Sequence, residues 1–159
     1  MGDREALVDF YLLTTGKFWY QKWNWNSNLG YKKWYGVDID NAGHVASIQL
    51  RENFLQGSLT EFHSFKKWKN LVTLTLFSNL LKGPLPSEIG GLESLRELNI
   101  SWNKFSGPLP DSFYDLKELR VIKIDHNEFD GEISPKIGQL VHLQYINLSF
   151  NKFSGIVAI

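Results

Sequence analysis

Acid–base chemistry is the first possibility that the side chains raise, because Asp125 directly precedes His126. General acid–base catalysis often uses a carboxylate next to an imidazole. However, neighbouring residues on a strand point to opposite sides, although the strand ends here, and no third group accompanies this pair. The other histidines, His44, His63 and His142, stand at unrelated positions and form no metal-ligating pattern. Cysteine is absent, which excludes disulfides, thiol nucleophiles and zinc–thiolate sites. We therefore predict no enzyme, no cofactor and no metal site.

A 24-residue period in the second half of the chain must position the remaining side chains. Equivalent leucines open four successive units, at Leu71, Leu95, Leu119 and Leu143. A degenerate earlier unit starts at Val45, and the unit that starts at Leu143 is incomplete. A fixed period of this length indicates a solenoid, in which each unit buries its apolar face by stacking on its neighbours.

Within each unit, certain residue types recur at positions that have a physical role. Apolar residues alternate with polar ones as in half-buried strands: Leu74 and Leu76, Leu98 and Ile100, Ile122 and Ile124, Ile146 and Leu148. An asparagine follows each strand, and we expect a ladder of buried amides that bond to turns: Asn53, Asn79, Asn103, Asn127 and Asn151. Glycines stand where the backbone must turn: Gly57, Gly83, Gly107, Gly131 and Gly155. Pro86 and Pro110 should keep the returning segment extended.

The full pattern, L-x-x-L-x-L-x-x-N-x-L-x-G-x-L-P-x-x-I-G-x-L, resembles the plant-type leucine-rich repeat over residues 45–159. The resemblance implies an α/β repeat: a right-handed leucine-rich-repeat solenoid of five units with a concave parallel β-sheet. It also implies a second, shorter strand in the G-x-L-P stretch, followed by a helical turn around Ile89 or Phe113.

Residues 1–44 are rich in aromatic side chains and precede the repeats. The aromatic residues are Phe10, Tyr11, Phe18, Trp19, Tyr20, Trp23, Trp25, Tyr31, Trp34 and Tyr35. Asp3 is expected to cap a helix that buries Leu7, Phe10 and Tyr11, and Gly16 to end it. The cluster could stack sugars or peptides, but we favour a helical N-terminal cap, because the end of a solenoid exposes core.

The cap interpretation also has support from the family. Trp34, Gly36 and Val37 match the W-x-G-V motif of the capping segment that precedes plant-type repeats. The cysteine pair usual in that segment is missing, and Lys32 and Ile39 stand near the corresponding positions.

In leucine-rich repeats, the variable strand positions project from the concave face, and we predict that a partner binds there. The predicted partner-binding residues are Arg51, Glu52, Thr75, Phe77, Asn99, Trp102, Lys123, Asp125, His126, Tyr145 and Phe150. Trp102, His126 and Phe150 occupy the same position in successive units, so their rings should form one stripe. The stripe is interpreted as an interaction surface; the alternative is that the rings only pack on one another and on the following loop.

Two features bear on where the protein acts. Asn99-Ile100-Ser101 and Asn147-Leu148-Ser149 match the N-glycosylation sequon. Because the repeat itself places Asn or Ser at these positions, we interpret the two matches as chance products of the repeat rather than as glycosylation sites. The start MGDREALVDF lacks a signal-peptide pattern, and with the missing cysteines this favours a cytoplasmic location. The alternative is the extracellular part of a membrane protein.

The C-terminal unit ends before its helical turn. Apolar residues would then line an open edge: Ile146, Leu148, Phe153, Val157 and Ile159. A longer array, end-to-end association and fraying all remain as explanations.

The composition is balanced, with 17 basic and 17 acidic residues, so no attraction to nucleic acid or anionic membrane is implied. No apolar stretch is long enough to span a membrane. We predict a non-catalytic protein- or peptide-binding module, in signalling or assembly. A fragment of a plant-like receptor-kinase ectodomain is the alternative; a binder of polysaccharide or ice is disfavoured, because the outward positions (Thr75, Asn99, Lys123) are mixed.

Overall fold

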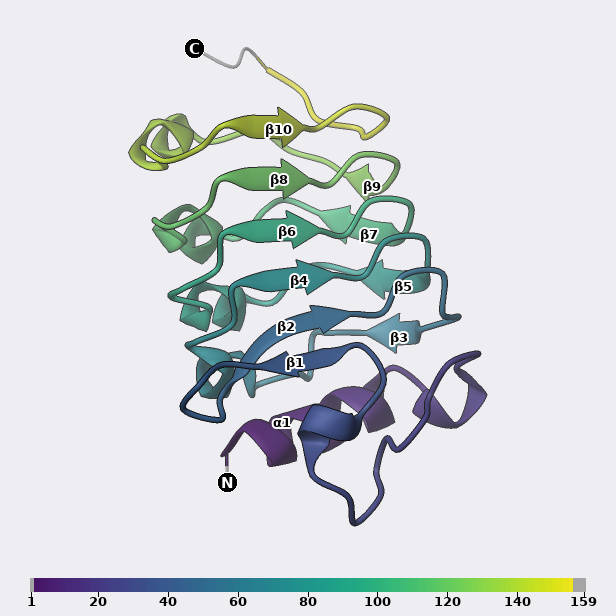
Figure 1. Ribbon diagram of the computed structural model, residues 1–159. Helices are drawn as coiled ribbons and strands as arrows, with labels where there is room; N and C mark the ends of the chain where they lie inside the picture. The colour runs from purple at the N-terminus through teal and green to yellow at the C-terminus, as the bar shows by residue number, and fades with distance from the viewer. Residues whose placement is uncertain (1, 156–159) are drawn as a thin grey trace.

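The computed structural model describes residues 2–155, which wind into a coil with one long sheet on one side (Figure 1). Within these residues that sheet has six strands in the order β1-β2-β4-β6-β8-β10. The strands are β1 Val37–Ile39, β2 Val45–Gln49, β4 Thr73–Thr75, β6 Glu97–Asn99, β8 Val121–Lys123 and β10 Tyr145–Asn147. Pairing is parallel and in register from β2 onward, whereas β1 pairs antiparallel with β2. The strand periodicity of the sequence is confirmed.

A second row of short strands runs along the other side of the coil (Figure 1). It consists of β3 Gln56–Ser58, β5 Leu80–Gly83, β7 Lys104–Gly107 and β9 Glu128–Phe129. Placing this strand in the G-x-L-P stretch was wrong, because β5 ends at the glycine of that motif. Gly83 has a left-handed φ of 78°, and the prolines that follow it have no N–H to donate to a neighbouring strand.

Short 3₁₀ helices complete the units: η3 Phe65–Trp68, η4 Ser87–Gly91, η5 Asp111–Asp115 and η6 Pro135–Gln139. The predicted helical turns around Ile89 and Phe113 are therefore confirmed. Pro86 and Pro110 precede η4 and η5 in extended conformation, with ψ of 155° and 151°. Both prolines thus hold the returning segment straight, as expected.

The N-terminal segment covers the first repeat with helix α1 Gly2–Leu13 and two 3₁₀ turns, η1 Gly16–Phe18 and η2 Tyr31–Lys33 (Figure 1). Phe10 lies at the centre of its core, 5.7 Å from Phe62 and 5.8 Å from Trp68 between ring centroids. Trp19 and Trp25 are also buried, with centroids 4.9 Å apart. The same hydrophobic core continues through the repeats. The division into residues 1–44 and 45–159 stays a prediction.

Two details of the N-terminal helix differ from the prediction. Asp3 lies inside α1, and its carboxylate accepts a hydrogen bond from the N–H of Val45 at 2.8 Å, so it ties the helix to β2. The helix ends at Leu13, and the left-handed residue after it is Thr15, with φ of 59°. Gly16 has a packing role, since a Cβ there would lie 2.0 Å from the ring of Tyr11.

The last strand, β10, leaves apolar surface exposed. Ile146 is 38% exposed, whereas its equivalents Leu98 and Ile122 are fully buried. Leu148 and Phe153 are partly buried against the core. Val157 and Ile159, which were expected at the same edge, lie outside the described residues.

Candidate functional site

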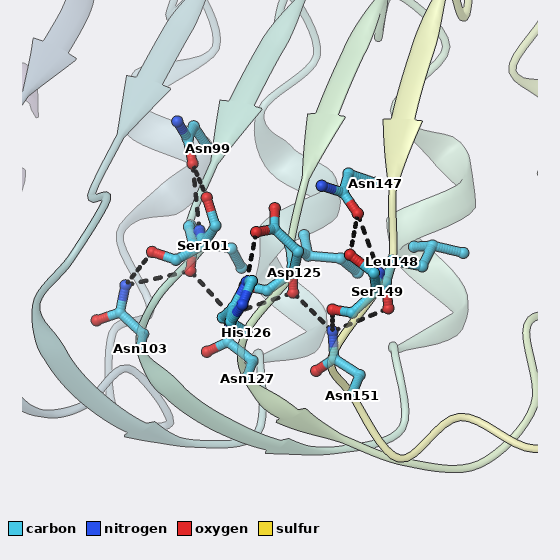
Figure 2. A network of polar contacts seen from close by, with 12 residues as sticks. Asn99, Ser101, Asn103, Asp125, His126, Asn127, Asn147, Leu148, Ser149 and Asn151 are labelled. Carbon is cyan, nitrogen blue, oxygen red and sulfur yellow. Dashed lines mark hydrogen bonds and ion pairs between the residues drawn. The ribbon is translucent and has the colours of Figure 1, made fainter.

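The ladder asparagines fix the backbone at the end of each long-sheet strand. The Oδ1 of Asn103 accepts from the N–H of Leu81 at 3.0 Å, and its Nδ2 donates to the carbonyl of Leu76 in the preceding unit at 2.9 Å. Asn127 and Asn151 repeat both contacts one and two units further on. Figure 2 shows Asn103, Asn127 and Asn151 at the ends of successive strands. The predicted ladder is confirmed, and it holds the residues just before each asparagine at a constant spacing.

A left-handed residue precedes every ladder asparagine. The residues and their φ angles are Glu52 (48°), Ser78 (55°), Trp102 (57°), His126 (52°) and Phe150 (54°). A non-glycine residue rarely adopts positive φ, and a run of five at one position is a built feature of the turn. As a consequence, the side chain of this residue does not follow the alternating orientation of the strand residues before it.

The predicted stripe of rings exists in the structure. Trp102 stacks on His126 with centroids 3.9 Å apart and planes 10° apart, and His126 stacks on Phe150 at 4.2 Å and 19°. The rings pack on one another, which was the alternative interpretation, and yet Trp102 remains 52% exposed and Phe150 72%. The stripe thus offers a rigid aromatic edge to solvent.

Asp125 and His126 are in contact, contrary to the expectation that they point to opposite sides. His126 Nδ1 lies 2.9 Å from Asp125 Oδ2, because the left-handed backbone at His126 turns its ring back over the preceding residue (Figure 2). Asp125 is 8% exposed, so the prediction that its side chain lies open on the concave face was wrong. Its carboxylate instead holds the middle ring of the stripe in place.

The remaining predicted residues lie on or beside the sheet with different exposures. Thr75 is 4% exposed, which contradicts its assignment to the open surface. This short side chain pairs with Gln49 on one side and Asn99 on the other, and both are longer. Lys123 and Tyr145 are available to solvent, with the lysine Nζ 5.8 Å from the tyrosine centroid. The remaining predicted partner-binding residues are partly or fully exposed to solvent: Arg51, Glu52, Phe77 and Asn99.

The two sequon asparagines use their side chains within the turn. Asn99 Oδ1 accepts from the N–H and hydroxyl of Ser101, at 3.2 Å and 2.5 Å. Asn147 makes the same pair of contacts with Ser149 (Figure 2). Both asparagines are partly exposed, so each lies outward as predicted. Whether they carry glycans stays a prediction.

A hollow of about 310 Å³ beside the stripe was missed in the sequence. Tyr20, Glu52, Phe54, Ser78 and Leu80 line it, and the rings of Tyr20 and Phe54 stack at 5.3 Å. The signal was present: the residue after each ladder asparagine is apolar in the first two units and charged in the next three. Phe54 and Leu80 thus differ from their charged counterparts in the later units, whereas the contribution of Tyr20 leaves no signal in the sequence.

The clearest electrostatic feature lies away from the sheet, between two units. His63 Nδ1 is 2.9 Å from Glu88 Oε1, and this hydrogen bond raises the pKa of His63 and lowers the pKa of Glu88. Among residues 2–155 there is no group of three or more histidine, aspartate or glutamate side chains that could hold a metal. Within the same residues no helix is long and apolar enough to cross a membrane.

Fold and surface together define a class: a solenoid of parallel-strand repeats held by an asparagine ladder, with an open face of mixed side chains. The family model for the leucine-rich repeat matches residues 70–92, 94–116 and 142–158. This chain belongs to the leucine-rich-repeat proteins, in the plant-type subclass.

The kinases that this chain matches are much longer than it, whereas some of the similar ectodomains are of comparable length. An LRR receptor-like serine/threonine-protein kinase of Arabidopsis thaliana, RGI3, is 43% identical over 65 residues, which are 41% of this chain and 6% of the kinase. The ectodomain of the Arabidopsis thaliana receptor kinase GASSHO1/SCHENGEN3, solved with CASPARIAN STRIP INTEGRITY FACTOR 2, is 32% identical with a TM-score of 0.85. The match covers 95% of this chain and 18% of that one. The PEPR1–AtPEP1 structure is 26% identical with a TM-score of 0.82, over 95% and 21% of the two chains.

These matches establish the predicted fold: a right-handed solenoid with a concave parallel sheet and a helical N-terminal cap. The kinases match only through their repeat regions, so the likeness concerns the repeat scaffold and not the kinase domain.

Proposed function

We propose that this chain is a non-catalytic module that binds a protein or peptide on the concave face of its solenoid, in signalling or assembly. The single observation that carries the proposal is the stripe of Trp102, His126 and Phe150. Exposed aromatic rings on a rigid scaffold are typical binding anchors, because they bury much area at little entropic cost. Here stacking and the left-handed turns already fix the rings.

The surface around the stripe suits an extended ligand. Partly exposed Asn99 and Lys123 and exposed Tyr145 present donors, a charge and a ring on neighbouring strands. Adjacent strands lie about 4.8 Å apart, so a peptide that crosses them meets a new side chain at each step. The face is open, whereas catalysis usually requires a site from which water is excluded.

The related structures support a peptide as the ligand. In two of them the receptors GASSHO1/SCHENGEN3 and PEPR1 are in complex with CASPARIAN STRIP INTEGRITY FACTOR 2 and AtPEP1, respectively. In a third, the plant peptide hormone receptor RGFR1 is in complex with RGF2.

The test is a selection of peptides from a displayed random library on the immobilised protein. Affinities of the selected peptides are then measured by calorimetry for the native chain and for Trp102→Ala and Phe150→Ala. We expect each substitution to weaken binding about tenfold or more, since truncated aromatic anchors cost about 2 kcal/mol or more.

Trp23→Ala is the matched control, because Trp23 is 71% exposed but belongs to the N-terminal segment. It should leave the affinities unchanged. Selected peptides that bind Trp102→Ala and Phe150→Ala as tightly as the native chain would refute the concave stripe as the binding surface.

The alternative is that the chain is a fragment of the extracellular ligand-binding domain of a receptor kinase. The likeness to receptor kinases favours it, and it predicts glycans on Asn99 and Asn147. An immunoblot of the native protein in its source cells, with and without glycosidase, tests this. A band near the 18.4 kDa of this sequence that glycosidase does not shift would contradict the alternative.

End-to-end association also stays a proposal. It is supported by the exposed Tyr145 and Ile146 on β10, since an open strand edge invites pairing. Sedimentation of the native chain and of Ile146→Lys should show a dimer only for the native chain. A native chain that remains monomeric at all concentrations would contradict it.

A further inference from the structure

We propose that the hollow beside Ser78 is a subsite for the guanidinium group of an arginine side chain carried by a peptide. The site lies where the N-terminal segment meets the first two repeats, outside the stripe of rings. It rests on the proposed peptide-binding function and adds to it the chemistry of one ligand group.

The row of positions that contains the stripe has a gap at Ser78. Glu52, Ser78 and Trp102 occupy equivalent positions in successive units, and backbone hydrogen bonds hold them in register. The N–H of Glu52 donates to the carbonyl of Phe77 at 2.8 Å, and the N–H of Ser78 donates to that of Ser101 at 2.9 Å. Ser78 is therefore the place in the row where a ring is missing.

Trp102 presents an open aromatic face to that place. One face of the indole is covered by His126, so the opposite face is directed toward the preceding unit, that of Ser78. No aromatic ring among the described residues stacks on it, and Trp102 is 52% exposed. The neighbouring units lie about 4.8 Å apart, which leaves room for one planar group on the indole.

Aromatic and apolar side chains line much of the hollow, together with Glu52, Ser78 and Asn79, and the open face of Trp102 lies beside it, one unit on from Ser78. Tyr20 and Phe54 form a stacked pair on the side of the N-terminal segment, and Leu80 lies on the side of the second row of strands. The Tyr20 backbone is held in place, since its N–H donates to the carbonyl of Asn53. A volume of about 310 Å³ suits a side chain and part of its backbone.

Charge complementarity identifies the occupant. Glu52 is exposed, and among the described residues that line the hollow it is the one with a charge. The adjacent Arg51 lines a different hollow, next to β1, and Lys22 donates to the carbonyl of Lys17. Lys104 is the nearby cation along the rim, because it occupies the position of Leu80 in the next unit.

Arginine fits this arrangement better than lysine. A guanidinium is planar, stacks on indole and still directs N–H donors sideways to a carboxylate. Position 52 lies two units, or about 10 Å, from position 102, so a cation resting on the indole lies between the ring and the Glu52 side chain.

The experiment follows amide and indole N–H signals of the isotope-labelled full chain by NMR, with blocked arginine (N-acetyl-arginine amide) as the probe. We expect saturable shifts at the Trp102 indole and at the amides of Ser78 and Leu80. Blocked citrulline has the same shape without the charge and should bind about tenfold more weakly. Glu52→Gln should produce a similar loss, whereas Lys104→Gln should tighten binding.

The matched control is Glu128→Gln, which removes an exposed rim carboxylate two units beyond Leu80 and should change nothing. Equal binding of citrulline, unchanged binding by Glu52→Gln, or the absence of shifts at Trp102 would overturn the subsite. A chain that fails this test but still binds selected peptides through Trp102 loses only the arginine subsite. If those peptides are also insensitive to Trp102→Ala, the proposed function fails independently.

Discussion

Replacing single asparagines of the ladder should destabilise the protein by different amounts. The loss should depend on how many backbone groups are hydrogen-bonded to that asparagine and to no other ladder asparagine. The Oδ1 of Asn79 accepts from the N–H groups of Asn53 and Leu55, at 2.9 Å and 3.0 Å. Its Nδ2 donates to the carbonyls of Leu50 and Leu76, at 2.9 Å and 3.0 Å. Of these four groups, only the Leu76 carbonyl accepts from a second ladder amide. Asn79→Ala therefore leaves three buried backbone groups without the ladder contact.

Asn103 has fewer partners of its own. Its Oδ1 accepts from the N–H of Leu81 at 3.0 Å, and its Nδ2 donates to the carbonyls of Leu76 and Ile100. Both carbonyls also accept from the amide of a neighbouring ladder residue. Asn103→Ala therefore leaves one backbone group unsatisfied.

The magnitudes follow from these counts. A buried donor or acceptor that loses its partner costs about 1–3 kcal/mol. We expect Asn103→Ala to lower the free energy of unfolding by about 1–3 kcal/mol, and Asn79→Ala by about 3 kcal/mol or more. Both variants delete the same atoms, so the loss of packing is similar and the difference reports the hydrogen bonds.

Urea unfolding followed by both tryptophan fluorescence and circular dichroism measures these free energies, provided that the two transitions coincide. Asn151→Ala serves as the control, because its amide is only partly buried and water can replace it. Equal losses for Asn79→Ala and Asn103→Ala, or a larger loss for Asn103→Ala, would refute the counting of unsatisfied groups.

Further predictions test backbone strain, charge and a buried hydroxyl. Gly57→Ala should destabilise more than Gly43→Ala in thermal melts. Both residues have positive φ, but a Cβ at position 57 would lie 2.6 Å from a backbone oxygen of the N-terminal segment, whereas nothing lies within 4 Å at position 43. In NMR titrations, His63 should become charged at a higher pH in the native chain than in Glu88→Gln, since Glu88 raises the His63 pKa. The stability that His63 contributes is present at low pH and is lost as pH rises through the raised pKa; an unchanged midpoint would contradict the contact. Tyr114→Phe should cost about 1–3 kcal/mol in urea unfolding, because the hydroxyl accepts from a backbone N–H of the next unit at 3.0 Å; no loss would show that water replaces it.

Most of the scaffold could be predicted from the sequence, because the same constraint is repeated several times. Each ladder asparagine and each turn glycine serves the same backbone geometry, so the recurrence reveals their roles. Position-specific features could not be read in this way. The burial of Thr75 depends on its two longer neighbours, and the Asp125–His126 contact depends on a left-handed residue that strand alternation does not predict.

The sequence predicted only those parts of the candidate site that recur at the same position in successive repeats. The rings at Trp102, His126 and Phe150 share one position, so the stripe was predicted. The hollow next to it is formed by Tyr20 from the N-terminal segment and Phe54 from the first unit. A contact between a non-repeating segment and one unit leaves no period in the sequence, and it requires the folded structure.

The first rung of the ladder differs from the others in its partner. Asn53 has no preceding repeat among the described residues, and its Oδ1 and Nδ2 bond to the N–H and carbonyl of Gln21, at 2.6 Å and 2.8 Å. The N-terminal segment thus supplies the backbone groups that a repeat would supply. The hydrogen-bonding interface between units is consequently interchangeable, and the solenoid can change its length in whole units. Deleting residues 95–118 would bring Leu119 to the place of Leu95 with the same ladder contacts available, so a shortened protein should keep the fold while its surface acquires a new order of side chains.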